Sequence, residues 1–218
     1  MKNVFKILAR KEGVKTDNLT KLLSPLGEVE IILDVEGDIE GHTGMTGRWR
    51  DSTTAWDVLF KGLEEEYTWI IEDDVAFNEE TIKSIFNKFK CEETDLISNW
   101  VAPRHLCVCW GWWYIFDIGL PRKDHWRSLN CFCRVSPSLI RKIKDFRVDR
   151  KRNLFHEISL PSLAKTRIDF RDACFAGYFE LNNYNWDKKV VRLDNIQEYK
   201  VYHPVKSDEK HTEICNYE

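Results

Sequence analysis

Three consecutive carboxylates, Glu72, Asp73 and Asp74, follow the apolar run "TWII" and precede the apolar residues "VAF". Like charges at the end of a buried strand repel one another and resist burial, so the cluster needs a compensating partner. Mg²⁺ and Mn²⁺ prefer oxygen ligands, and Mg²⁺ is commonly held by carboxylates together with substrate phosphates. The cluster therefore predicts a site for Mn²⁺ or Mg²⁺ and a diphosphate. The alternative is that Asp73 or Asp74 caps the following helix, or that all three side chains face water.

The size and composition of the chain predict one globular domain, residues 1–218. The sequence is 43% hydrophobic and 13% aromatic, and its formal net charge of −3 gives no electrostatic case for a nucleic-acid binder. The start "MKNVFKILARKEG" lacks the long apolar region of a secretory signal. The longest apolar run, Leu106 to Phe116, is too short for a transmembrane segment. We therefore expect a cytoplasmic protein, in the host cell cytoplasm if the chain is viral.

The seven cysteines are an odd number, which favours reduced thiols over a disulfide framework. The pairs Cys107/Cys109 and Cys131/Cys133 raise the question of a zinc site. Both pairs lie in strand-like stretches, "LCVCW" and "NCFCR", where alternation puts the two members of a pair on one face of a sheet. Structural zinc sites usually space their cysteines by about two to four residues on a turn. We therefore expect buried, inert thiols.

Strands and helices alternate over the first hundred residues. Strands are predicted over 3–9, 29–34, 68–71 and 95–100, and helices over 17–26 with Asp17 as cap, from about residue 51 or 52 onward, and after the cap Asn78. This alternation is typical of an α/β fold with a mainly parallel sheet and helices on both faces. Ligands of such sheets bind beyond the carboxyl ends of the strands, where Arg10, Asp34 and the acidic cluster are expected to meet.

The second half is less regular and predicts a smaller antiparallel part. We expect two strands, "LCVCWGWWYIF" and "SLNCFCRV", which would pair in antiparallel fashion. Ser136 caps a helix predicted over 137–144, and the basic run 141–152 is expected on an exposed helix face and loop. A short helix is predicted over 154–164, and a short strand followed by a turn within 199–206.

Helix, strand and acidic cluster form the block "WDVLFKGLEEEYTWIIEDDVAF", which resembles the nucleotide-sugar half of GT-A glycosyltransferases. In that superfamily the acidic cluster is the DXD motif, often written EDD. The segments "VEIILDVEGD" and "YHPVK" are similar to the second strand and the C-terminal segment of the family. The overall pattern also resembles a glycosyltransferase domain encoded by a chlorella virus, which is compatible with one domain of a larger polypeptide.

The resemblance implies a cation, Mn²⁺ or Mg²⁺, that bridges to the diphosphate of a UDP-sugar donor. Asp74 is the first choice as metal ligand, with Asp73 beside it, although the cluster is Glu-Asp-Asp rather than Asp-X-Asp. His203 is expected to complete the metal shell, and Lys206 to contact a phosphate.

The resemblance also implies residues for the donor. Asp34 is expected to contact the base or ribose, with Ala9 and Arg10 at the same nucleoside end, and Arg50 or Arg48 to grip the donor. The glycines at 41, 44 and 47 match neither a Rossmann fingerprint nor a P-loop, and they suit a loop that orders over the donor.

Glu157 is the candidate catalytic residue. In inverting members of the family a carboxylate in this region is the general base for the acceptor hydroxyl, whereas in retaining members such a group stabilises the developing positive charge. Both outcomes stay open. The alternative is that Glu157 is a helix N-terminal charge and His156 a packing residue. "HEISL" is not a zincin motif, because Leu160 stands where the second histidine would be.

An aromatic stretch is a candidate platform for a glycan acceptor, because aromatic rings stack on the apolar faces of sugars. It comprises Trp110, Trp112, Trp113, Tyr114 and Phe116, with Trp126 nearby. Residues 1–100 would form the nucleotide-sugar-binding half and residues 101–218 the acceptor-binding half.

The sequence thus predicts a metal-dependent glycosyltransferase that moves a sugar from a UDP-sugar to a carbohydrate hydroxyl, in glycan synthesis of a viral glycoprotein. One alternative is a non-catalytic nucleotide-sugar- or carbohydrate-binding module. Another is a sugar-1-phosphate nucleotidyltransferase. That class has a glycine-rich signature after its first strand, whereas "ILARKEGVK" holds one glycine.

Overall fold

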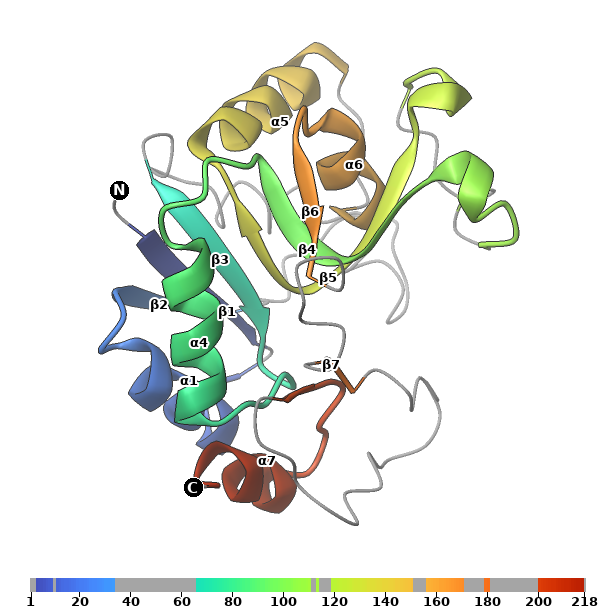
Figure 1. Cartoon of the computed structure of the whole chain (residues 1–218). Helices are drawn as coiled ribbons and strands as arrows, with labels where there is room; N and C mark the ends of the chain where they lie inside the picture. The colour runs from blue at the N-terminus through green and yellow to red at the C-terminus, as the bar shows by residue number, and fades with distance from the viewer. Residues whose placement is uncertain are drawn as a thin grey trace.

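The computed structural model describes residues 3–9, 11–33, 66–110, 113, 119–150, 156–170, 179–180 and 200–217, without the side chains of 147–150 and 179–180. These residues form a mixed α/β fold around a six-stranded sheet in the order β2-β1-β3-β5-β4-β6 (Figure 1). Strand β1 runs parallel to β2 and β3, and β4 runs parallel to β6, whereas β5 is antiparallel to its neighbours β3 and β4. The predicted α/β class with a mainly parallel sheet is confirmed.

The strands of the central sheet are β1 (Asn3–Ala9), β2 (Glu28–Leu33), β3 (Tyr67–Glu72), β4 (Leu96–Pro103), β5 (Trp126–Val135) and β6 (Arg167–Asp169). A second sheet consists of the parallel pair β7 (Phe179–Glu180) and β8 (Val201–Tyr202). The helices are α1 (Val14–Leu23), α4 (Glu79–Phe89), α5 (Pro137–Arg150), α6 (His156–Leu163) and α7 (Asp208–Cys215), with short 3₁₀ helices at Arg104–Leu106 and Arg122–Asp124.

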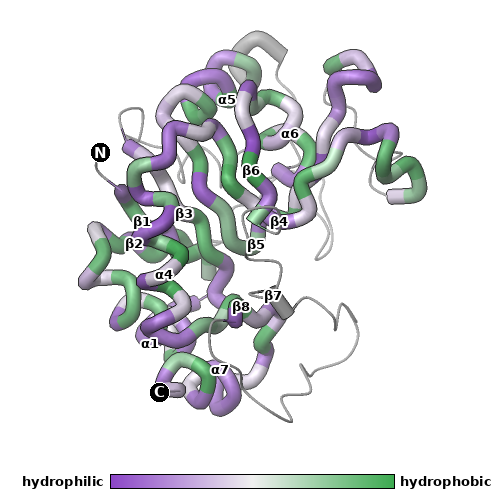
Figure 2. Tube along the Cα trace, in the orientation of Figure 1, coloured by the Kyte–Doolittle hydropathy of each residue, from purple (hydrophilic) through white to green (hydrophobic). Residues whose placement is uncertain are grey.

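Helices cover both faces of the sheet, as the alternation predicted. On one face, Phe5, Trp69 and Ile71 pack with buried apolar residues of α1, α4 and α7. On the other face, Val4 and Ile70 pack with residues of α5 and α6. Alternate residues of one strand thus feed opposite cores (Figure 2), and each fully buried aliphatic or aromatic side chain stabilises the fold by about 1.5–3 kcal/mol. None of the helices in the described ranges is long and apolar enough to cross a bilayer.

Local signals at helix ends explain one confirmed boundary and two corrections. The predicted cap of α4 is present, since the Asn78 side chain accepts a hydrogen bond from the Thr81 backbone N–H at 3.0 Å. Helix α1 begins at Val14 instead of 17, because the Thr16 hydroxyl closes the first turn through hydrogen bonds with the Gly13 backbone. Asp17 therefore lies inside the first turn. Helix α5 continues past residue 144 to Arg150, where lysine and arginine are good helix formers.

The predicted strand over 106–116 is wrong for its described part. After Pro103 the chain forms a 3₁₀ turn, and the side chains fold back onto their own segment. Trp113 Nε1 donates to the Cys107 carbonyl at 2.8 Å, and Cys107 Sγ donates to the Pro103 carbonyl at 3.2 Å. Residues 104–110, 113 and 119–125, here called the arm, project from the sheet between β4 and β5 (Figure 1). Antiparallel pairing occurs instead between β5 and its neighbours in the central sheet.

The cysteine pairs also depart from the expected arrangement. An irregularity in the β4–β5 register, between the pairs Ile97/Arg134 and Asn99/Leu129, turns Cys131 and Cys133 into opposite cores. Such a bulge inserts extra residues and re-aims side chains. Both thiols are buried, as expected, whereas Cys109 is exposed on the arm. The cysteines of the described ranges are free thiols.

Candidate metal and donor site

The acidic cluster lies where the predicted parallel sheet required it, at the carboxyl end of β3. Leu8 of β1 pairs with Glu72, and the Asp73 backbone N–H donates to the Leu8 carbonyl at 2.9 Å. Ala9, which ends β1, is buried beside this edge. The cluster therefore begins as the sheet ends, with Glu72 still in the strand and Asp74 in the turn that follows.

The C-terminal segment returns to this edge through a short backbone ladder. Ala76 and Tyr202 exchange two backbone hydrogen bonds of 3.0 and 2.9 Å, and the Val205 N–H donates to the Asp74 carbonyl at 2.7 Å. Because the ladder fixes residues 202–205 against 74–76, the side chains of His203 and Lys206 are presented to the acidic cluster. The predicted convergence of the "YHPVK" segment with the cluster is present.

Glu72, Asp74 and His203 form the candidate metal site. His203 Nε2 lies 3.2 Å from Glu72 Oε2 and 3.3 Å from Asp74 Oδ1, and the three ligand atoms lie within 4.8 Å of one another. Asp74 and His203 are only 5% and 6% exposed. Asp74 Oδ1 is buried without a well-formed hydrogen bond, and Asp74 Oδ2 forms an ion pair with Lys206. Two carboxylate oxygens and one imidazole nitrogen suit a divalent cation such as Mn²⁺ or Mg²⁺.

The electrostatics of the site follow from this crowding. Burial opposes ionisation of Asp74, but His203 and Lys206 outweigh it and hold the Asp74 pKa well below its ordinary value. Burial likewise opposes charge on His203, yet Cys131, Asp74 and Glu72 hold its pKa well above the ordinary value. In the metal-free protein an imidazolium therefore occupies the place that a cation would compensate. Metal ligation requires that proton to leave.

Asp73 is not in the ligand group, although the sequence suggested it as a ligand beside Asp74. Burial and the neighbouring Asp74 raise the Asp73 pKa, and Lys15 acts in the opposite direction. Glu72 takes the ligand position instead, a role that the sequence-based assignment had missed. The signal was the two-residue spacing of Glu72 and Asp74, because alternate residues of an extended chain point the same way. His203 and Asp74 are brought together as expected.

Glu157 lies at the start of α6, within electrostatic reach of the metal site. Asn130 Nδ2 of β5 donates to the His156 carbonyl at 2.9 Å and anchors the start of this helix to the sheet. Burial, and then the charge of Glu72, raise the pKa of Glu157 to about 8, while His203 and Arg127 counteract them. His156 is buried, which lowers its pKa to about 4 and makes it a neutral packing residue.

The remaining donor residues fall outside the described ranges. These are Arg10, Asp34, Arg48 and Arg50, together with the glycine loop and the helix predicted from residue 51 or 52. The aromatic residues Trp112, Tyr114 and Phe116 also lie outside them. Trp113 is a packing residue rather than an open platform, because it is buried against Ile158 and lies under Arg104. Trp126 is stacked by the guanidinium of Arg167 at 4.3 Å.

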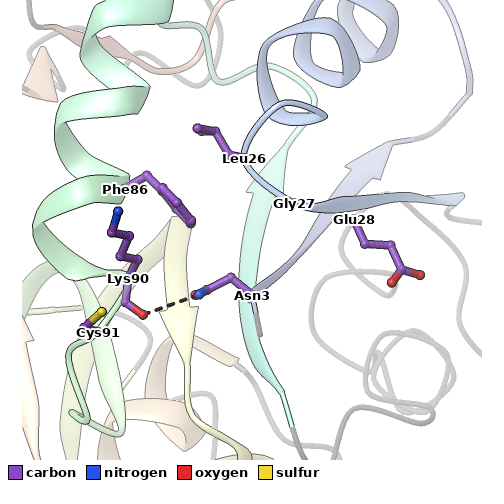
Figure 3. Close-up of a pocket in the computed structure, with 7 residues that line it drawn as sticks. All are labelled: Asn3, Leu26, Gly27, Glu28, Phe86, Lys90 and Cys91. Atoms are coloured by element: carbon purple, nitrogen blue, oxygen red, sulfur yellow. Dashed lines mark hydrogen bonds between the residues drawn. The ribbon is translucent and has the colours of Figure 1, made fainter. Parts of the chain in front are cut away.

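A pocket of about 360 Å³ lies at the opposite edge of the sheet (Figure 3). Asn3 starts β1, Gly27 precedes β2 and Lys90 follows α4, so the pocket marks the amino ends of these parallel strands. Asn3 Nδ2 donates to the Lys90 carbonyl across it at 3.4 Å. The pocket is therefore separate from the metal site.

No protein-family model matches the chain, and no curated protein matches it. Among solved structures the chain is similar to an active-site mutant of LgtC, a glycosyltransferase with the GT-A fold. The identity is 9% over 97% of this chain and 94% of that chain, with a TM-score of 0.46. It is also similar to A197 from STIV, at 14% identity over 65% of this chain and 68% of that chain, with a TM-score of 0.33. At these values neither likeness assigns a family or an activity to the chain.

Proposed function

We propose that this chain is a metal-dependent glycosyltransferase of the GT-A type, which moves a sugar from a UDP-sugar donor to a carbohydrate hydroxyl. The observation that carries the proposal is the convergence of Glu72, Asp74 and His203 at the carboxyl end of β3, the edge where α/β sheets bind ligands. Glu72, Asp74 and His203 would hold the cation, which when bound stabilises the negative charge of the diphosphate leaving group.

The other residues of the site have roles that follow from their positions. Lys206 has a side chain that is 62% exposed, so its ammonium can reach a phosphate of the donor while it stays beside Asp74. Glu157 accepts the proton of the acceptor hydroxyl, whose oxygen bonds to the anomeric carbon as the bond from that carbon to the diphosphate breaks. The bonding pair leaves with UDP. A raised pKa near the working pH suits a general base.

The test is the binding of UDP to the intact chain by calorimetry, with and without Mn²⁺, followed by UDP release from a panel of UDP-sugars. We expect UDP binding that needs Mn²⁺ and slow hydrolysis of one donor. D74N and H203Q should lose the metal-dependent binding by about 100-fold, whereas E80Q, an exposed carboxylate on α4, should keep it. Metal-independent UDP binding without turnover would support the binding-module alternative, and unchanged Mn²⁺-dependent binding in D74N would refute the proposed metal site.

A further inference from the structure

Arg127, the second residue of β5, holds its guanidinium near two indole rings without a hydrogen-bond acceptor. The guanidinium carbon lies 5.9 Å from the ring centre of Trp100 and 5.6 Å from that of Trp110. Its Nε is buried without a partner, and the described ranges supply no ion pair or hydrogen bond to this side chain. A partly buried cation in this state has donors to spare.

Other arginines that stack on aromatic rings in this chain differ from Arg127 in this respect. Arg134 lies 4.0 Å from the ring centre of Tyr67 and donates to the Glu92 carbonyl. Arg167 stacks on Trp126 and donates to the Pro161 carbonyl. Arg104 stacks on Trp113 and lies 3.1 Å from His125 Nδ1. Cation–π contact contributes about 0.5–2 kcal/mol but leaves N–H groups unsatisfied, so Arg127 is the arginine suited to an external anion.

Arg127 lies on the same edge of the sheet as the metal site. Because β5 is antiparallel to β4, its first residues meet the carboxyl end of β4, where Arg127 pairs with Ala102. The charge of Arg127 also acts on the Glu157 carboxyl, as do those of Glu72 and His203. A ligand that contacts Arg127 would therefore lie near the candidate base.

The backbone at Trp100 is held in an unusual conformation. Its φ is +51°, in the left-handed region that bulky residues rarely adopt. Val101 N–H donates to Asp169 Oδ2 at 2.9 Å, which secures the chain next to this residue. Backbone strain of this kind is often found at functional sites. Here it accompanies the placement of an indole beside the Arg127 guanidinium.

We propose that Arg127, Trp100 and Trp110 form an acceptor subsite for an acidic sugar, whose carboxylate binds the guanidinium and whose ring lies against an indole. The inference rests on the proposed function and narrows its acceptor from carbohydrates in general to anionic ones. A guanidinium binds a carboxylate through two parallel hydrogen bonds, and indole faces pack on the C–H face of a pyranose. The shared chemistry is an oxyanion, which a donor diphosphate could also supply.

The test compares methyl β-D-glucuronide with methyl β-D-glucoside, which differ at C6, by ligand-observed NMR titration of the intact chain with Mn²⁺ and UDP. We expect the glucuronide to bind about tenfold more tightly or better, and R127M to abolish this preference. R122M is the matched control, since Arg122 is exposed on the arm, and it should keep the preference. R127K should retain part of it. Thermal unfolding checks folding, and R127K with R127Q replaces R127M if that variant does not fold.

The outcomes separate this inference from the proposed function. Equal binding of the two glycosides, or a preference that survives in R127M, overturns the acidic subsite while Mn²⁺-dependent UDP binding leaves the transferase proposal intact. Weaker UDP binding in R127M without glucuronide binding assigns the oxyanion to the donor and also overturns the subsite. Arg127-dependent glucuronide binding in a chain that binds no UDP supports the subsite and refutes the transferase.

Discussion

His203 Nε2 lies 3.2 Å from Glu72 Oε2, although 131 residues separate the two along the chain. The contact joins the end of a central strand to a segment near the C-terminus, and Asp74 completes the group. Because the imidazole and the carboxylates compete with a cation for the same space, the site couples metal binding to protonation. The predictions below use this coupling and the two features nearest to it, Glu157 and the start of α4.

Mn²⁺ affinity should rise with pH while His203 is protonated. The His203 pKa is held well above its ordinary value, so at neutral pH the cation must displace a proton. For one proton released, the association constant should increase about tenfold per pH unit below the raised pKa. Calorimetry at pH 6, 7 and 8 in buffers of different ionisation enthalpy measures both the slope and the proton release. H203Q should bind Mn²⁺ weakly and without this slope; an equal slope in the variant would locate the proton elsewhere.

E157Q should lose turnover without losing the donor. The glutamine keeps the size of the side chain but cannot accept a proton, so UDP release in the presence of acceptor should fall about 10²–10⁴-fold. Mn²⁺-dependent UDP affinity should stay within about twofold, because Glu157 is not among the metal ligands. E209Q, on the exposed side of α7, serves as control. Full turnover in E157Q would show that another group is the base.

Glu157 should also make the stability of the metal-free protein depend on pH. Its pKa is about 8 in the folded chain and near 4.5 when unfolded, so the folded state binds the extra proton between these values. The free energy of unfolding should fall as pH rises from about 4.5 to 8, by at most about 1.4 kcal/mol per pH unit for this group. Urea unfolding of the wild type and E157Q at several pH values measures the difference. A variant with the same pH dependence would contradict the raised pKa.

N78A should destabilise the fold through α4 and the C-terminus together. The Asn78 side chain accepts hydrogen bonds from Thr81 and donates to the Tyr217 carbonyl at 3.2 Å. Loss of the cap should lower the free energy of unfolding by about 1–2 kcal/mol. N87A, at an exposed site in the same helix, should change it by less than about 0.5 kcal/mol. Equal effects in urea unfolding would mean that the cap is unimportant.

Local sequence signals were sufficient for much of the fold. Apolar runs predicted β1, β2, β3 and the start of β4 within about two residues, because strand periodicity and burial act over neighbouring positions. The Asn78 cap was readable for the same reason. The arm was not, since "LCVCW" has strand propensity but its backbone turns to satisfy contacts with Trp113 and Pro103. Propensity yields to packing there.

The sequence by itself determined that carboxylates end a central strand, since a parallel α/β sheet places such residues at its binding edge. Only the tertiary structure decided that Glu72 and Asp74, rather than Asp73, face His203, because the Ala76–Tyr202 ladder brings the C-terminal segment to that side. It also decided that Arg127 stands beside Trp100 and Trp110, through the pairing of β4 with β5. Contacts between residues far apart in the chain depend on how whole elements pack, and no local pattern encodes that packing.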